Sequence, residues 1–142
     1  MNPCIIIDYA DQYQPVFKEL NVEWLDQYNL TESHDLEILD NPHKTILAEG
    51  GVIYLAQSDN RIVGSAALIK EHDGMYELAK MAVAKEFRKM GISKLLLEKC
   101  IEKAKELKAT KIILFSNHQL KAALGYMKNM DFNMFPLRIH HS

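Results

Sequence analysis

A basic, glycine-containing turn joins a strand-like segment to a long amphipathic helix, and this junction constrains the fold more than any other part of the sequence. The apolar run Tyr76–Val83 precedes the turn, and the helical pattern Ile92–Leu107 follows it. The first amides of a helix lack an intrahelical acceptor and lie at the positive end of the helix dipole, so they can bind phosphate. The turn region carries a net charge of +3 in a chain of net charge −2, from Lys85, Arg88, Lys89 and Lys94 against Glu86. A phosphate-binding loop is therefore predicted, with an ordinary solvated turn as the alternative.

Strands and helices alternate along the rest of the chain. The apolar patterns predict strands at Cys4–Asp8, Val52–Gln57, Arg61–Lys70, Met75–Val83, Lys111–Phe115 and Phe132–Leu137. Helical spacing predicts helices at Gln12–Gln27, Leu30–Asn41, Ile92–Lys108 and Leu120–Met130. Turn residues between the three middle strands indicate an antiparallel meander, whereas the helix before Lys111–Phe115 makes that strand parallel to Met75–Val83. The predicted fold is a mixed α+β sheet and not an alternating β-α-β nucleotide fold.

Length and composition fit one domain over residues 1–142. With 48% hydrophobic and 25% charged residues, the chain resembles an ordinary globular protein. Cys4 and Cys100 have neither redox nor zinc spacing and are expected to be reduced core thiols. Neither a signal peptide nor an apolar run of membrane-spanning length is evident, so no membrane association and a cytoplasmic location are expected.

Charge is distributed unevenly along the chain. Residues 1–45 hold nine acidic and two basic residues, whereas residues 46–142 hold ten acidic and fifteen basic ones. The basic residues form one short loop and a lysine-rich helix that also carries glutamates, so a nucleic-acid-binding face is not expected. The six histidines lack metal-ligand spacing, and no metal site is predicted.

The loop and the strand before it together match a known pattern. Arg88-x-x-Gly91-x-Ser93, preceded by Glu77-Leu78-x-x-Met81-x-Val83, resembles the acyl-CoA-binding motif of the GCN5-related N-acetyltransferases, the GNAT superfamily. The usual form of that motif is Gln/Arg-x-x-Gly-x-Gly/Ala, and Ser93 replaces the final Gly or Ala with another small residue. The resemblance covers nearly the whole chain. It implies a sheet with a splayed parallel strand pair, helices on both faces and acetyl-CoA as the cofactor.

The resemblance also implies which residues hold acetyl-CoA. In this family a bulge splays the strand before the loop, and the backbone of that strand grips pantetheine; Met81, Ala82 and Val83 occupy that place here. An amide near Ala82 or Val83 is the expected oxyanion donor. The loop residues expected at the pyrophosphate are Arg88, Lys89, Met90, Gly91, Ile92 and Ser93. Asn117 is a further cofactor ligand, with an N-cap role for the next helix as the alternative.

Two residues are candidates for proton transfer. Several family members have a catalytic glutamate, acting through water, where Glu77 stands. Apolar neighbours would raise the pKa of Glu77 toward neutrality. The alternative is a solvent-facing Glu77 paired with Lys80 or Lys70.

The family's usual general acid is a tyrosine in a second motif. Aligning Ala123 and Phe132 with that motif puts Met127 in the tyrosine position. Tyr126, the candidate here, is one residue early, a rotation of about 100° on a helix. Water is the alternative proton source for the thiolate.

The resemblance implies transfer of acetyl to a primary amine of a small molecule or peptide. The net charge of −7 in residues 1–45 favours a cationic acceptor. The alternative function is a weak or inactive CoA-binding regulatory module. Family members usually close with one more strand than the sequence predicts here, and a partner subunit could supply it, so a monomer or a homodimer is expected.

Overall fold

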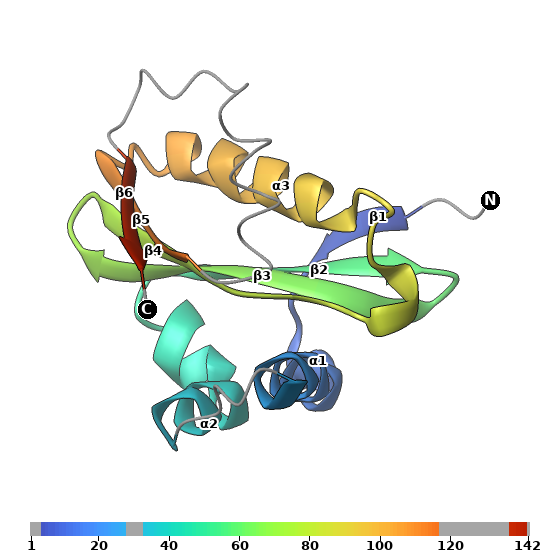
Figure 1. The fold of residues 1–142 in the computed structure, drawn as a ribbon. Coiled ribbons are helices and arrows are strands. Elements are labelled where there is room, and N and C mark those ends of the chain that lie inside the picture. The colour runs from blue at the N-terminus through green and yellow to red at the C-terminus, as the bar shows by residue number, and fades with distance from the viewer. Residues whose placement is uncertain (1–3, 28–32, 117–136, 142) are drawn as a thin grey trace.

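The computed structural model describes residues 4–27, 33–116 and 137–141. Its centre is a six-stranded mixed sheet whose strands lie in the same order as in the sequence (Figure 1). The strands are β1 (Cys4–Asp8), β2 (Val52–Ser58), β3 (Arg61–His72), β4 (Met75–Val83), β5 (Lys111–Ser116) and β6 (Leu137–His141). The first four strands are antiparallel, and β4, β5 and β6 are parallel to one another. The predicted meander and the predicted parallel pair are both confirmed.

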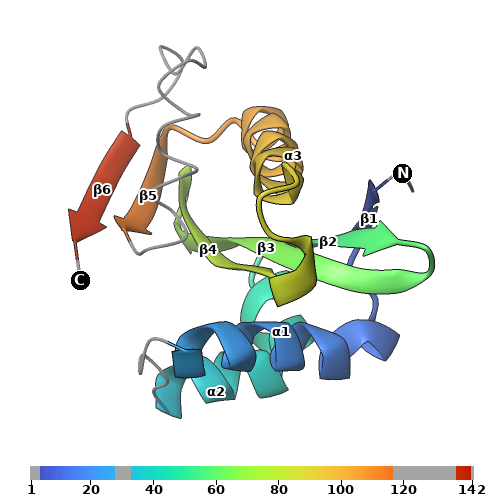
Figure 2. The same ribbon diagram turned by 45° about the vertical axis from the view of Figure 1, so that its right-hand side comes forward.

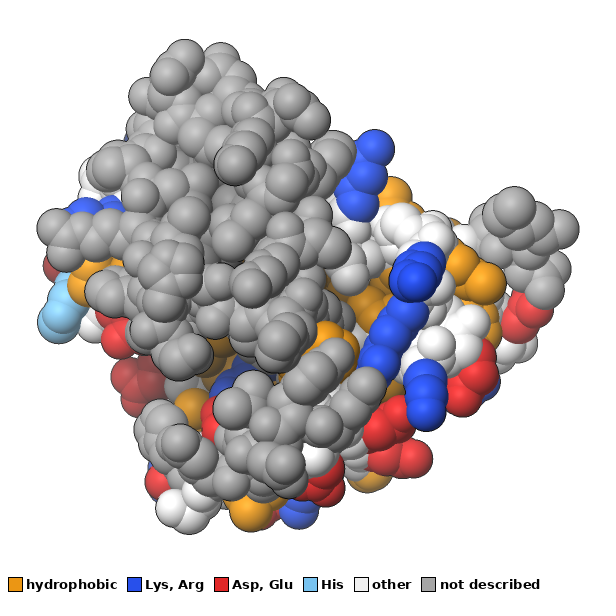
Figure 3. Space-filling model, viewed as in Figure 1, with side chains coloured by type: hydrophobic (Ala, Val, Ile, Leu, Met, Phe, Trp, Pro, Cys, Tyr) orange, Lys and Arg blue, Asp and Glu red, His pale blue; other side chains and the backbone are white. Residues whose placement is uncertain are grey.

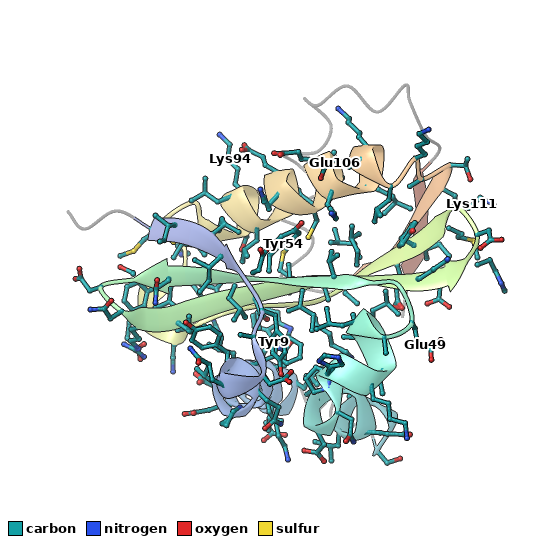
Figure 4. All side chains as sticks on the ribbon, turned by 180° about the vertical axis from the view of Figure 1, so that it is seen from behind. Tyr9, Glu49, Tyr54, Lys94, Glu106 and Lys111 are labelled. Atoms are coloured by element: carbon teal, nitrogen blue, oxygen red, sulfur yellow. The ribbon has the colours of Figure 1, made fainter. Side chains whose placement is uncertain are left out.

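Helices cover both faces of the sheet, which makes three layers. The helical elements are η1 (Asp11–Tyr13), α1 (Gln14–Gln27), α2 (Ser33–Asp40), the π-helical turn η2 (His43–Leu47), the 3-10 turn η3 (Lys85–Phe87) and α3 (Ile92–Glu106). Helix α3 lies on one face, and α1 and α2 lie on the other (Figure 1). Figure 4 shows Tyr54 on the α3 side of the sheet and Tyr9 on the α1 side. The predicted α+β class with helices on both faces is confirmed.

Helix α3 packs closely on the sheet because one face of the helix is apolar and the strand beneath its first turns has a glycine, Gly64, at the contact. Ile92, Leu96, Cys100 and Ala104 are all buried, as their helical spacing predicted. A Cβ atom on Gly64 of β3 would lie 3.1 Å from Ile92 Cγ2 and 3.2 Å from Leu96 Cδ1. The absence of a side chain at Gly64 therefore lets the first turns of α3 sit directly on the sheet.

Two element ends differ from the predictions. Helix α3 ends at Glu106, and Lys108 adopts a left-handed φ of 59°. The amide of Ala109 bonds Ala104 O at 2.9 Å, which closes the helix before the predicted end at Lys108. The last strand was predicted at Phe132–Leu137, whereas β6 covers Leu137–His141 and so ends later than predicted. Residues 132–136 lie outside the described residues.

The split between β4 and β5 is the feature of the fold that positions the site. Their pairing runs from Met75 opposite Lys111 to Leu78 opposite Leu114, and within the described part of the chain no pair follows although β4 continues to Val83. Figure 2 shows β5 and β6 inclined away from the other strands. The second half of β4 therefore presents a backbone edge that β5 does not pair.

Candidate active site

The loop after β4 is held in a tight, left-handed turn. Ala84 N bonds Val63 O at 2.8 Å, which keeps the end of β4 on β3. Lys89 has a φ of 64° and Gly91 a φ of 82°, so the backbone turns sharply before α3 begins at Ile92. The first intrahelical bond joins Leu95 N to Gly91 O at 3.2 Å. The amides of Ile92 and Ser93 precede that bond and have no acceptor within the helix, as the phosphate-loop prediction requires.

Arg88 shapes this loop from inside. Its Nε donates to Val83 O at 3.0 Å, and its guanidinium lies 4.9 Å from the ring of Trp24 in α1. Sequence reasoning placed Arg88 at the pyrophosphate, but these contacts show the side chain tying the loop to β4 and α1. Sequence reasoning missed Trp24, because no local pattern links a helix residue to a loop so distant along the chain.

A second arginine holds the opposite side of the loop. Arg61 Nη2 lies 3.3 Å from Glu86 Oε2, and its guanidinium is 5.3 Å from the ring of Phe87. Both side chains of the ion pair are exposed, so the contact contributes only ~0–1 kcal/mol to stability. Its effect is to fix η3 against the start of β3.

The outer surface of the loop is basic and open. Lys85, Lys89 and Lys94 are exposed, and Figure 3 shows Lys and Arg side chains in a row on this face. A Cβ atom on Gly91 would meet nothing within 4 Å. The space directly in front of the Gly91 backbone can therefore admit an anion, and the surrounding lysines favour one electrostatically.

A β-bulge lies where β4 leaves β5. Ser65 pairs with Ala82 and Ala67 with Ala79, so Lys80 and Met81 together oppose Ala66. Lys80 has a φ of 55°, a conformation that costs about 1–2 kcal/mol for a residue other than glycine. The bulge expected from the resemblance is present, directly before Met81, Ala82 and Val83.

The end of β4 turns one of the expected oxyanion donors toward the split. Successive peptide groups of a strand face opposite edges. Because the amide of Ala84 faces Val63 on β3, the amide of Val83 faces the other edge, where β5 has diverged. Of the two amides expected near the thioester, the geometry favours that of Val83.

Glu77 lies on β4 before the bulge, on the α1 and α2 side of the sheet. It pairs with Ile69 of β3 and Ile113 of β5 and is half-buried. The pKa of Glu77 is raised from 4.5 to about 7, first by burial and then by charge repulsion and a side-chain hydrogen bond from Glu71. Lys80 opposes the shift, and Asp35 adds to it. A carboxyl with this pKa can exchange a proton near neutral pH.

Lys80 is engaged mainly by Asp35. Its Nζ lies 2.5 Å from Asp35 Oδ1 in α2, and the two side chains are only 11% and 22% exposed. Lys80 thus pairs with Asp35 and acts on Glu77 through its charge, which lowers the pKa of Glu77. Lys70 has its own partner, with its Nζ 3.4 Å from Asp73 Oδ1.

The raised pKa of Glu77 predicts a pH-dependent effect of Glu77→Gln on stability. A carboxyl whose pKa rises from 4.5 to about 7 on folding stabilises the protein most below pH 4.5 and loses that contribution as pH rises through 7. Glutamine does not titrate, so the stability of the Glu77→Gln variant does not change with pH for this reason. In urea unfolding, the free energy of unfolding of the variant relative to that of the wild type should increase by about 1–2 kcal/mol from about pH 5 to about pH 8. This figure is reduced to allow for the partial solvent exposure of Glu77. A difference between the two proteins that does not change with pH would contradict the assigned pKa.

Some predicted site residues lie outside the described residues. Asn117, Tyr126 and Met127 are among them, so their predicted roles stay predictions. The strand that leads to Asn117 is present, since β5 ends at Ser116. In the described ranges, the His, Cys, Asp and Glu side chains form no group of three that could hold a metal ion. None of the helices in those ranges is long and apolar enough to cross a membrane.

Comparison with known proteins agrees with this geometry. The family model described as Acetyltransferase (GNAT) family matches residues 13–132, so the chain belongs to this family of acyltransferases. A Bacillus subtilis relative described as the uncharacterized N-acetyltransferase YvbK is 33% identical over 98 residues. That match covers 67% of this chain and 63% of the relative, so the chain spans less than two thirds of that protein.

Solved structures show the same fold. A GNAT-family acetyltransferase from Staphylococcus aureus Mu50 has a TM-score of 0.78 and 28% identity, over 89% of this chain and 81% of that one. A predicted acetyltransferase with acetyl-CoA from Clostridium acetobutylicum has a TM-score of 0.74 and 14% identity, over 94% of both chains. The predicted family and fold are confirmed.

Proposed function

We propose that the protein transfers the acetyl group of acetyl-CoA to a primary amine by direct attack in a ternary complex. The observation that carries this proposal is the order of three features along one segment: a carboxyl of pKa about 7 and then a bulge on β4, followed after the strand by the glycine turn that begins α3. The carboxyl would take a proton from the amine, the bulge would free backbone groups to bind the thioester, and the glycine turn would bind the pyrophosphate. The Clostridium structure with acetyl-CoA and the shared family support the choice of donor.

The donor would lie along β4 and across the loop. The amides of Gly91, Ile92 and Ser93 would bind the pyrophosphate, with Lys89 and Met90 completing the turn and Arg88 fixing it from inside. The backbone of Met81, Ala82 and Val83 would hold pantetheine as a neighbouring strand does. The thioester carbonyl would then lie near the Val83 amide, where a hydrogen bond strengthens as negative charge develops on oxygen.

The reaction needs one proton removed and one supplied. An acceptor that arrives as an ammonium first loses one proton to solvent; the neutral amine nitrogen then attacks the thioester carbonyl carbon, and the proton it sheds on forming the amide passes to Glu77, directly or through water. The carbon–sulfur bond then breaks, and the thiolate takes a proton from Tyr126 or from water. The products are an acetylated amine and free CoA. Chemistry of this kind requires no covalent enzyme intermediate, since the bound amine is itself the nucleophile.

Calorimetric titration with acetyl-CoA tests the donor half of the proposal. Binding of one acetyl-CoA per chain, weakened by salt because part of the affinity is electrostatic, is the expected result. Absence of heat at about millimolar acetyl-CoA would exclude an affinity useful to an acetyltransferase, because KM values of enzymes lie at about 1 μM–1 mM.

The acceptor is proposed to be cationic. Glu77, Glu71 and Asp35 all lie on the α1 and α2 side, where an amine would approach the thioester from the face opposite α3. Some acidic side chains of residues 1–45 already have partners at the protein surface: Lys18 Nζ lies 2.5 Å from Asp40 Oδ1, and His43 Nδ1 lies 3.2 Å from Asp11 Oδ1. The remaining acidity of this face still favours an approaching ammonium group.

A free-thiol assay on a panel of amines tests this acceptor prediction. Polyamines and basic peptides should give a higher kcat/KM than neutral amines of similar nucleophilicity, and added salt should lower kcat/KM for the polycations alone. The matched control is kcat at saturating amine, which salt should change little. Equal kcat/KM for neutral and polycationic amines, with no effect of salt, would contradict a cationic acceptor.

A further inference from the structure

The bulge in β4 is unusual because a lysine takes a position that favours glycine. A bulge residue in the left-handed region is normally Gly, since a Cβ atom is strained there. Lys80 has a φ of 55°, so the surrounding structure must hold it in place. Two helices, α1 and α2, supply contacts that do this.

The first contact reaches the Lys80 backbone from α1 through two buried polar side chains. Ser65 Oγ donates to Lys80 O at 2.7 Å. Asn21 Nδ2 in turn lies 3.0 Å from Ser65 Oγ and 2.9 Å from Phe17 O, so it donates to both. Ser65 is 0% exposed and Asn21 3% exposed. Every hydrogen atom in this relay has one defined acceptor, which fixes the direction of the Lys80 carbonyl.

The second contact reaches the Lys80 side chain from α2. The ion pair with Asp35 is largely shielded from solvent, unlike the exposed pairs elsewhere on α1 and η3. The backbone and side chain of Lys80 are therefore each held by a different helix.

We infer that Asn21, Ser65 and Asp35 are positioning residues for acetyl transfer, which act by holding Lys80 in its left-handed conformation. This inference rests on the proposed function. The bulge at Lys80 determines the direction in which the backbone N–H and C=O groups of Met81, Ala82 and Val83 point. Loss of the brace would let β4 straighten against β3 and move those groups away from the thioester. The pyrophosphate loop is tied down separately, by Arg88 and by the bond from Ala84 N to Val63 O.

Ser65→Ala is the sharpest test, with Ser58→Ala as its matched control. Ser58 is also a buried serine on the sheet, at the end of β2 away from the bulge. We expect Ser65→Ala to lower kcat by about 10- to 100-fold, the scale of a misplacement near 1 Å, with a smaller change in the Kd of acetyl-CoA. Ser58→Ala should leave kcat within about twofold. Equal effects of the two variants on kcat, at matched fractions of folded protein, would overturn the inference.

A second pair of variants separates positioning from stability. Glycine adopts a positive φ without strain, so Lys80→Gly should keep the bulge with less need of the brace. Ser65→Ala should then lower kcat by a smaller factor in the Lys80→Gly background than in the wild type. The same factor in both backgrounds would mean that Ser65 does not act through Lys80.

One readout remains valid even if the proposed function fails. If the wild type does not turn over acetyl-CoA, hydrogen exchange at the amides of Lys80–Ala82 becomes the test of the brace. Faster exchange in Ser65→Ala at constant global stability, with no change in Ser58→Ala, would support the inference. Unchanged exchange in both would overturn it.

Discussion

Gly91→Pro is expected to abolish measurable binding of acetyl-CoA. Gly91 has a φ of 82°, whereas proline requires a φ near −65°, so the turn before α3 cannot keep its shape. Proline also removes an amide donor at the point where the pyrophosphate is proposed to bind. We expect at least about 100-fold weaker binding, equivalent to two lost charge-assisted hydrogen bonds. Isothermal titration with acetyl-CoA measures it.

Gly91→Ala gives a milder version with a clean control. An added Cβ meets no protein atom within 4 Å, so in the free protein the variant bears only the strain of its positive φ. Gly74→Ala, in the turn between β3 and β4, bears a similar backbone strain at a φ of 77°, and its added Cβ would also lie 2.9 Å from Thr110 Oγ1, so it is the more destabilising of the two variants. Gly91→Ala should weaken acetyl-CoA binding and Gly74→Ala should not, although both lose stability. Wild-type affinity in Gly91→Pro would show that the loop does not hold the cofactor.

Glu77→Gln is expected to lower kcat/KM by about 10²- to 10⁴-fold, the usual contribution of a general base. In the wild type, kcat/KM calculated on the neutral form of the amine should rise with pH until Glu77 is deprotonated and level off above about 7. The variant should lose that acid limb, because glutamine does not titrate. Its affinity for acetyl-CoA should stay within about twofold, since Glu77 precedes the bulge and the loop follows it.

Glu71→Gln is the matched control for this prediction. Glu71 raises the pKa of Glu77 through charge and a hydrogen bond, so its replacement should move the acid limb to lower pH and preserve the plateau rate. If kcat/KM of Glu71→Gln rose over the same pH range as that of the wild type, Glu71 would not raise the pKa of Glu77, which would contradict the assigned interaction. A Glu77→Gln variant with wild-type kcat/KM at pH 8 would remove Glu77 from the mechanism.

The sequence alone predicted the parts of the site that follow from local pattern. The limits of β4, the glycine turn and the start of α3 at Ile92 match the structure, because apolar alternation, glycine and helical spacing are all short-range signals. The buried face of α3 matches for the same reason. The role of Glu77 as a base remains a prediction, although the structure provides the raised pKa that such a role needs.

Contacts between distant segments were not predictable in the same way. The inward side chain of Arg88 depends on Trp24 in α1, and the bulge at Lys80 depends on Ser65, Asn21 and Asp35. None of these pairs is close in sequence, and lysine is an unfavourable residue for a left-handed bulge. Even the resemblance to a family, which implied a bulge, did not show what would hold it.

The most direct measurement of the central claim follows the acetyl group itself. The protein is incubated with acetyl-CoA labelled on the acetyl carbons and with the best amine of the panel, and both products are quantified by mass spectrometry and thiol titration. The proposed function predicts labelled acetylated amine and free CoA in equal amounts, both lost together in Glu77→Gln. Bound acetyl-CoA with no free thiol, or free thiol with labelled acetate and no acetylated amine, would contradict it.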